Sequence, residues 1–96
     1  MYAVWSRVTL GVGMRSTAEK LCDQFAPVFR GFKGFKSTTF LFDEEAGDLA
    51  ALTVWESKRD AEAATEAVGS KSEEAVKGMA KGPVTRQFFG VYEPKT

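Results

Sequence analysis

The chain has 96 residues, 44% of them apolar and 27% charged, which is enough for one globular domain, residues 1–96, with a single core. Its 13 basic and 13 acidic residues cancel, and this disfavours nucleic acid as a partner, because domains that bind phosphate backbones usually carry a basic excess. With no histidine and 1 cysteine, a single chain cannot build a His-dependent catalytic triad, a proximal-His haem, a His-ligated zinc site or an internal disulfide.

The location of the protein follows from two further absences in the sequence. No run of about 18 apolar residues exists, so we expect no membrane span. The opening residues 1–7 do not show the basic and then apolar pattern of a signal peptide, and a lone cysteine suits a reducing compartment. We therefore expect a cytoplasmic protein.

The first half of the chain predicts a strand, a helix and a second strand. Residues 2–10 alternate between two sets of side chains, as a strand does. Ser16 and Glu19 fit a capping box at the start of a helix, and Pro27 is expected to end or kink that helix. The stretch 35–43 is rich in β-branched and aromatic residues and predicts the second strand. One apolar stripe at helical spacing supports the helix: Ala18, Leu21, Cys22, Phe25 and Phe29.

A hairpin and a second helix are predicted next. The polar turn 43–48 joins the second strand to an apolar stretch, 49–57, which predicts a third strand running into a helix cap. Ser57 and Asp60 have the spacing of a capping box with a shorter acid. The Ala-rich segment 61–68 is strongly helical by propensity.

The chain should end with a helix break and a last strand. The Gly-Ser pair at 69–70 is expected to interrupt the second helix, with Ser72 opening a further turn or two. Gly82 and Pro83 stop that segment, and residues 84–92 predict the fourth strand.

The element order β-α-β-β-α-β indicates an α+β, ferredoxin-like fold. Right-handed crossovers place both helices on one face of a four-stranded antiparallel sheet, with the first and third strands central. Every predicted strand carries apolar groups on both of its sets, so the face without helices would expose a large apolar surface. We therefore expect a homodimer through the sheet faces, with Trp5 in the dimer core.

Three segments of the sequence resemble the antibiotic biosynthesis monooxygenase-like (ABM-like) family of dimeric α+β barrels. They are Arg7-Val8-Thr9-Leu10, the Gly-Phe-Lys-Gly-Phe turn at 31–35, and Leu52-Thr53-Val54-Trp55-Glu56-Ser57, of which the last is the most specific. The resemblance runs over nearly the whole chain. It implies a pocket within each protomer, between helices and sheet, and either cofactor-free oxygenation of polycyclic phenols or haem degradation. Members that degrade haem ligate the iron with a histidine, so the absence of histidine speaks against that activity, and we expect no cofactor.

The resemblance and the residue chemistry point to Trp55, Ser6 and Arg86 as candidate catalytic residues. Trp55 stands where the family has a pocket tryptophan, and it could stack on a flat ligand or simply pack in the core. Ser6 stands where family members often have Asn, and it offers one hydroxyl in place of an amide. Arg86 or Arg7 could clamp a phenolate, although an ion pair or a position at the sheet edge is the simpler interpretation of either arginine.

Three other side chains are weaker candidates for the site. Gln87 would point at the pocket if its strand set faced the helices, and backbone partners would satisfy it equally well. Cys22, on the buried stripe, is predicted to be an inert core thiol. Tyr92 could act as an acid only after a large fall in its pKa, for which the sequence offers no cause.

Two functions remain open from the sequence. The first is a cofactor-independent monooxygenase-like enzyme acting on a planar, electron-rich aromatic, with Trp55 and Ser6 shaping the pocket and an arginine stabilising the anion. The second is a non-catalytic dimeric barrel that binds a small hydrophobic ligand or serves only assembly.

Overall fold

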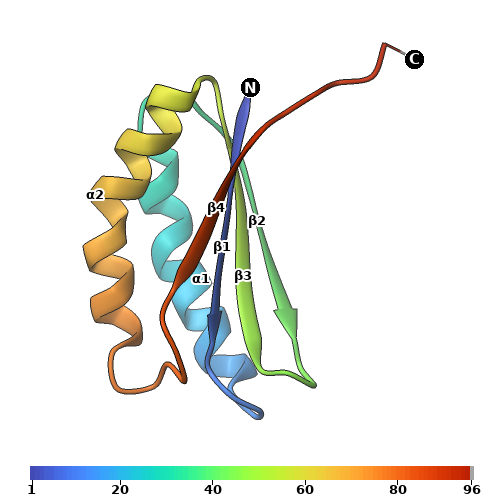
Figure 1. The fold of residues 1–96 in the computed structure, drawn as a ribbon. Helices are drawn as coiled ribbons and strands as arrows, with labels where there is room; N and C mark the ends of the chain where they lie inside the picture. The colour runs from blue at the N-terminus through green and yellow to red at the C-terminus, as the bar shows by residue number, and fades with distance from the viewer. Residues whose placement is uncertain (96) are drawn as a thin grey trace.

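The computed structural model describes residues 1–95 and has the predicted order of elements (Figure 1). No helix within these residues is long and apolar enough to cross a membrane. The elements are β1 (Tyr2–Thr9), α1 (Arg15–Arg30), β2 (Phe35–Asp43), β3 (Asp48–Trp55), α2 (Lys58–Val76) and β4 (Thr85–Gly90).

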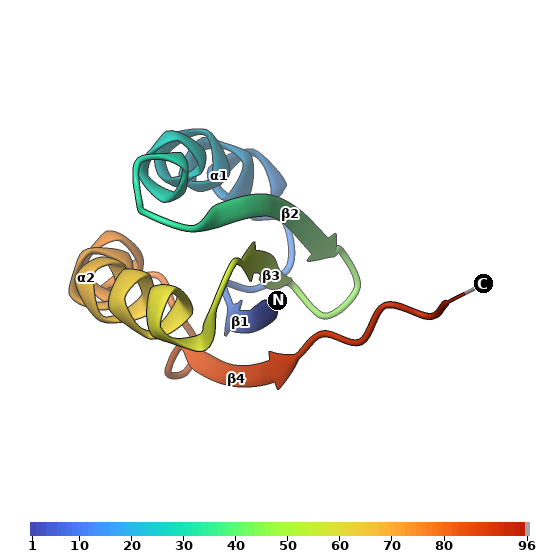
Figure 2. The same ribbon diagram turned by 90° about the horizontal axis from the view of Figure 1, so that it is seen from above.

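The strands form one antiparallel sheet in the order β2-β3-β1-β4, so β1 and β3 are central as predicted. Tyr2 faces Trp55 and Thr9 faces Asp48 in the β1–β3 register, which is continuous between these ends. The β2–β3 ladder shifts register once, between Phe35 and Ser37. Both helices cover the same face of the sheet, α1 beside β2 and α2 toward β4 (Figure 2). The fold is therefore α+β and ferredoxin-like.

The core fills the space between the helices and the sheet. Strand alternation sends Val4, Val8 and their cross-strand neighbours toward the helices, where they meet the buried stripe of α1 and the inner side of α2. One cluster of buried residues comprises Val8, Leu10, Ala18, Leu21, Phe25, Val68 and Val76. A second cluster, nearer the end of the sheet at Trp55, comprises Val4, Trp55, Ala61 and Ala64.

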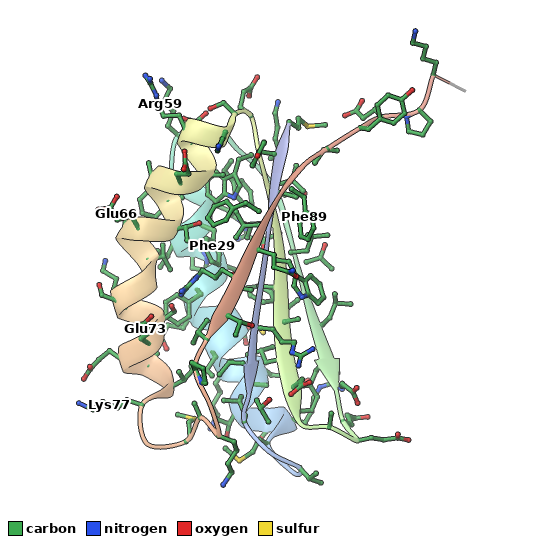
Figure 3. All side chains as sticks on the ribbon, viewed as in Figure 1. Phe29, Arg59, Glu66, Glu73, Lys77 and Phe89 are labelled. Carbon is green, nitrogen blue, oxygen red and sulfur yellow. The ribbon has the colours of Figure 1, made fainter. Side chains whose placement is uncertain are left out.

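The opposite face of the sheet is bare, and much of it is apolar. It carries Trp5 and Leu52, which face each other across β1 and β3, together with Leu41 and Phe89 on the outer strands. Leu41 is 47% exposed and Phe89 46% exposed. Figure 3 shows Phe89 pointing away from the helices. The sequence-based expectation of an apolar face without helices is therefore met within the protomer.

The start of each helix tests the two predicted capping boxes. Ser57 is the N-cap of α2, and its Oγ accepts a hydrogen bond of 3.2 Å from the Asp60 N–H, as predicted. The box at Ser16 is wrong, because Ser16 already lies inside α1: the N-cap is Met14, two residues earlier, and it makes no side-chain hydrogen bond. Glu19 instead forms a 3.3 Å ion pair with Arg15, one turn back on the helix surface.

Neither predicted helix break interrupts a helix. Helix α1 continues through Pro27 to Arg30, so Pro27 does not end it. Pro27 and Asp23, whose carbonyl loses its intrahelical donor, are both exposed to water, while Val28 and Phe29 pack the last turn against the core. The gain from that packing outweighs one missing hydrogen bond.

Helix α2 likewise runs without a break through Gly69 and Ser70 to Val76. The Ser72 Oγ donates a 2.9 Å hydrogen bond to the Gly69 carbonyl, and Val68 and Val76 are buried on either side of the glycine. Packing of these two valines holds the helix together where propensity alone predicts a break.

Candidate functional site

A cavity of about 100 Å³ lies between the two helices and the sheet. Most of its wall is apolar and comes from α1, α2 and the inner sets of the strands. The polar residues along it are Ser6, Arg7, Cys22, Thr53, Thr65, Ser72 and Arg86. The apolar lining consists mainly of Val4, Val8, Leu21, Phe25, Phe29, Phe40, Leu49, Val68, Val76 and Val84.

Ser6 and Arg86, two of the predicted site residues, come together at this cavity. They are direct partners in the β1–β4 register and both belong to the set that faces the helices. The Arg86 Nη2 donates a 3.0 Å hydrogen bond to the Ser72 Oγ on α2. The Arg86 Nη1 lies 3.8 Å from a carboxylate oxygen of Glu73, and the arginine side chain is 20% exposed. A half-buried guanidinium thus sits where β4 meets α2.

Trp55 lies next to the cavity, and the residues that line the cavity do not include it. Its side chain is 1% exposed, and the edges of the Phe29 and Phe35 rings meet it at centroid distances of 6.4 and 5.6 Å. Its indole N–H donates a 2.9 Å hydrogen bond to the Thr53 Oγ1. Thr53 itself lines the cavity, so it stands between Trp55 and the empty space.

The sequence analysis missed Thr53 and Ser72. Thr53 is 4% exposed, and strand alternation places it on the same face as Trp55, two residues away. A polar residue inside the apolar run 49–55 was the available signal. Ser72 could not have been found, because the predicted break in the helix removed it from the face that carries Val68 and Val76.

Strand alternation points the side chains of Arg7 and Gln87 to the bare face of the sheet, although Arg7, next to Ser6 in β1, is also among the residues that border the cavity. Arg7 pairs at 3.7 Å with Asp48, which also accepts a hydrogen bond from the Thr9 hydroxyl. Gln87 faces Trp5 across β1 and β4, so its strand set points away from the helices. The sequence allowed two interpretations of Arg7, a clamp on a phenolate or a structural ion pair, and the contact with Asp48 is the ion pair.

Cys22 and Tyr92 differ in burial and in their distance from the cavity. The Cys22 thiol is partly buried at the cavity wall, and burial, together with the negative charges of Asp23 and Glu19, raises its pKa above the ordinary value of 9.0. The thiol is therefore neutral at physiological pH. Tyr92 follows β4 and is 76% exposed, away from the cavity.

The electrostatics of the cavity favour a ligand that accepts hydrogen bonds or carries negative charge. Within residues 1–95 the lining contains no carboxylate, and Arg86 brings a positive charge to the inner face. The hydroxyl groups of Ser6 and Thr65 can supply further donors, whereas the Ser72 hydroxyl already donates to the Gly69 carbonyl. A flat apolar group with one anionic oxygen matches this combination of an apolar wall and a polar edge.

Two other features of the described residues complete the description of the surface. Residues 1–95 contain no cluster of three or more Cys, Asp or Glu side chains arranged to hold a metal ion. A second hollow of about 350 Å³ lies between α1 and the edge strand β2, with Phe40, Phe42 and Leu49 on its sheet side and Arg15, Glu19 and Asp23 on its helix side. It gathers none of the predicted catalytic residues.

Comparison with known proteins gives matches in structure and none in sequence. A scan against protein-family models and a search of curated proteins both found no match. A candidate antibiotic biosynthesis monooxygenase from Deinococcus radiodurans superimposes with a TM-score of 0.81 at 12% identity, over 100% of this chain and 97% of that one.

Two structures from Streptomyces give similar results. The N63A mutant of SnoaB, a cofactor-independent oxygenase from Streptomyces nogalater, gives a TM-score of 0.76 at 18% identity, over 98% of this chain and 95% of the other. The ActVA-Orf6 monooxygenase from Streptomyces coelicolor, in complex with nanaomycin D, gives a TM-score of 0.74 at 17% identity, over 98% of this chain and 92% of the other. The chain has the ABM-like fold. At these identities the likeness concerns the fold, and within it the cavity lies in the place that the ABM-like resemblance predicted for a pocket.

Proposed function

We propose that this protein is a cofactor-independent monooxygenase-like protein that binds or acts on a planar aromatic small molecule. The observation that carries the proposal is the half-buried guanidinium of Arg86, paired in register with Ser6, at the edge of an apolar cavity. The ABM-like fold supports it, since SnoaB is described as a cofactor-independent oxygenase and ActVA-Orf6 as a monooxygenase.

The proposed chemistry depends on an electron-rich ring that has lost a proton. A cation in a region of low dielectric lowers the pKa of a bound phenol and stabilises the phenolate, which can then pass an electron to dioxygen. Arg86 supplies that charge, Ser6 adds a hydroxyl beside it, and Trp55 shapes the wall through its hydrogen bond to Thr53.

The size of the cavity limits the ligand. About 100 Å³ is below the range of about 300–1,000 Å³ found for sites that enclose drug-sized molecules. The cavity accommodates roughly one aromatic ring, and a polycyclic ligand would extend beyond it.

The second candidate function is a non-catalytic barrel that binds a small hydrophobic ligand. Two observations favour it: Ser6 replaces the Asn that the family often carries, and the Trp55 indole N–H already has a partner inside the protein. A site of this kind would hold an aromatic ligand without presenting an amide to dioxygen.

Oxygen uptake and ligand binding, measured on the same panel of hydroquinones, naphthols and anthrones, separate the two functions. The enzyme predicts oxygen uptake that depends on one class of substrate and falls at least tenfold in Arg86→Gln, because a charged hydrogen bond contributes roughly 1.5–3 kcal/mol. Arg59→Gln, an exposed change at the start of α2, is the control for a loss of positive charge (Figure 3). Binding without uptake across the panel supports the second function. Absence of both from the folded protein refutes the proposal.

We also propose a homodimer in which the bare sheet faces pack together. Trp5, Leu52 and Phe89 provide an apolar centre, and burying such a surface is the usual reason for two-fold association. Sedimentation should give twice the protomer mass, and Trp5→Glu should shift it toward one protomer while the helical content is unchanged. A wild-type monomer at concentrations of tens of micromolar would contradict the proposal.

A further inference from the structure

The Arg86 guanidinium has more donors than partners in this structure. Its Nη2 donates to the Ser72 Oγ at 3.0 Å, while Nη1 lies 3.8 Å from Glu73, beyond hydrogen-bond distance. A guanidinium carries five N–H donors in a fixed fork. Arg86 can therefore donate to a planar anion without losing its hydrogen bond to Ser72.

The Glu73 carboxylate lies outside the cavity. Ser72 and Arg86 line the cavity, and Glu73, 64% exposed on the outer part of α2, does not (Figure 3). An exposed carboxylate at this distance is well solvated, so its attraction to Arg86 is weak and easily exchanged for another anion. The half-buried cation lacks a strong counter-charge.

Helix α2 holds the guanidinium in place through Ser72 and Gly69. The Ser72 hydroxyl donates its proton to the Gly69 carbonyl, which leaves its oxygen free to accept from Arg86. A Cβ at position 69 would lie 3.8 Å from Nη2, an ordinary van der Waals distance, so Gly69 lies beside the guanidinium without being required there. The guanidinium is thus positioned at the seam between α2 and β4, with Nη1 as its unbonded terminal nitrogen.

We propose that Glu73 is a placeholder for the ligand's own anionic group, so that Ser72, Glu73 and Arg86 form a clasp across the α2–β4 seam. A carboxylate or phenolate on an aromatic ring takes the place of Glu73 on Nη1, while Ser72 keeps Nη2 in position. Displacement of Glu73 leaves Nη1 free at the edge of the cavity, where Arg86 and Ser72 line it. The clasp selects ionised aromatic acids over neutral rings of the same size, and Glu73 sets the strength of that selection. This inference rests on the proposed aromatic-binding function.

Benzoate and benzyl alcohol provide a matched pair of probes, equal in ring size and different in charge. Dissociation constants for both come from the backbone and arginine side-chain NMR signals of the wild type and four variants. We expect benzoate to bind the wild type more tightly than the alcohol, and Glu73→Gln to strengthen benzoate binding about two- to fivefold, the worth of one exposed ion pair. The alcohol should bind Glu73→Gln and the wild type equally. Glu74→Gln, which removes the adjacent exposed carboxylate, should change neither value.

The remaining two variants test the role of Arg86. Arg86→Gln should abolish the preference for benzoate while the alcohol still binds, and Arg86→Lys should keep a reduced preference, since it retains the charge without the planar fork. Binding of both probes with the same ratio in the wild type and Glu73→Gln overturns the clasp and leaves the aromatic site standing. A folded protein that binds neither probe overturns the clasp and the proposed function together.

Discussion

Replacing Thr53 by Val is expected to destabilise the protein by leaving the Trp55 indole N–H without an acceptor. The side chains are nearly equal in volume, so the change removes the 2.9 Å hydrogen bond to Oγ1 without opening a cavity. Both residues are buried, Trp55 at 1% and Thr53 at 4% exposure, so water cannot replace the lost acceptor. An orphaned buried donor costs about 1–3 kcal/mol, and this is the expected fall in the free energy of unfolding.

The neighbouring Thr38 supplies a matched control with the opposite sign. It faces Thr53 directly across β2 and β3, and its Oγ1 is buried without a hydrogen-bond partner. Thr38→Val removes an unsatisfied polar atom, so it should leave stability unchanged or raise it by up to about 1 kcal/mol. The same substitution on two paired strand positions thus separates the hydrogen bond from any general effect of Val in the sheet.

Urea unfolding followed by circular dichroism measures both effects, and a double-mutant cycle assigns the first to Trp55. At a slope of about 1 kcal/mol per molar for a chain of this size, Thr53→Val should lower the midpoint by about 1 M or more. In a Trp55→Phe background no N–H exists to be orphaned, so Thr53→Val should cost less than about 0.5 kcal/mol. An equal cost in the two backgrounds would refute the reasoning, because the penalty would then arise from Thr53 itself.

Three further predictions concern a turn, the thiol and a helix cap. Gly47→Ala should lower the free energy of unfolding by roughly 3 kcal/mol, because the residue has φ +73° and a Cβ would overlap the backbone of Gly11. Gly13→Ala is the control: with φ +81° and open space around the position, it should cost only the backbone strain of about 1–2 kcal/mol. Alkylation of Cys22 should be slower than that of free cysteine at neutral pH and should rise only as pH passes above 9.0, since its raised pKa keeps the thiol protonated; fast labelling at pH 7 would contradict this. Ser57→Ala should lower stability by about 1 kcal/mol, and Ser16→Ala should change it by less than about 0.5 kcal/mol, which thermal unfolding of the two variants will test.

The fold was predictable because several independent signals agree. Each of three local signals identifies one element: alternation for β1 and β3, a polar turn for the hairpin before Asp48, and the cap at Ser57 for α2. The right-handed crossover rule then leaves little choice of topology. The errors lie at Ser16, at Pro27 and at Gly69-Ser70, where local chemistry competes with packing. At Pro27 the partly buried side chains of Val28 and Phe29 decide the outcome, and nothing in the local sequence shows how well they will pack.

The site was less predictable, since its geometry depends on contacts between distant residues. Sequence spacing placed Ser6 and Arg86 on strands without showing that they would face each other, which depends on the β1–β4 register. Trp55 was left open between core and pocket. Its burial beside the cavity, with Thr53 between, corresponds to neither alternative alone.

The continuity of α2 through Gly69 connects the error in the sequence analysis to the proposed clasp. Residues 69, 72 and 73 lie three and four apart, so an unbroken helix puts them on one side, facing Arg86. A helix broken at 69–70 would have lost that alignment, and Arg86 would have no hydroxyl to hold it. The glycine that weakens the helix by propensity is also the residue whose carbonyl accepts from the Ser72 hydroxyl, and the Ser72 oxygen in turn accepts from Arg86. The low helix propensity of Gly69 is thus offset by the packing of Val68 and Val76.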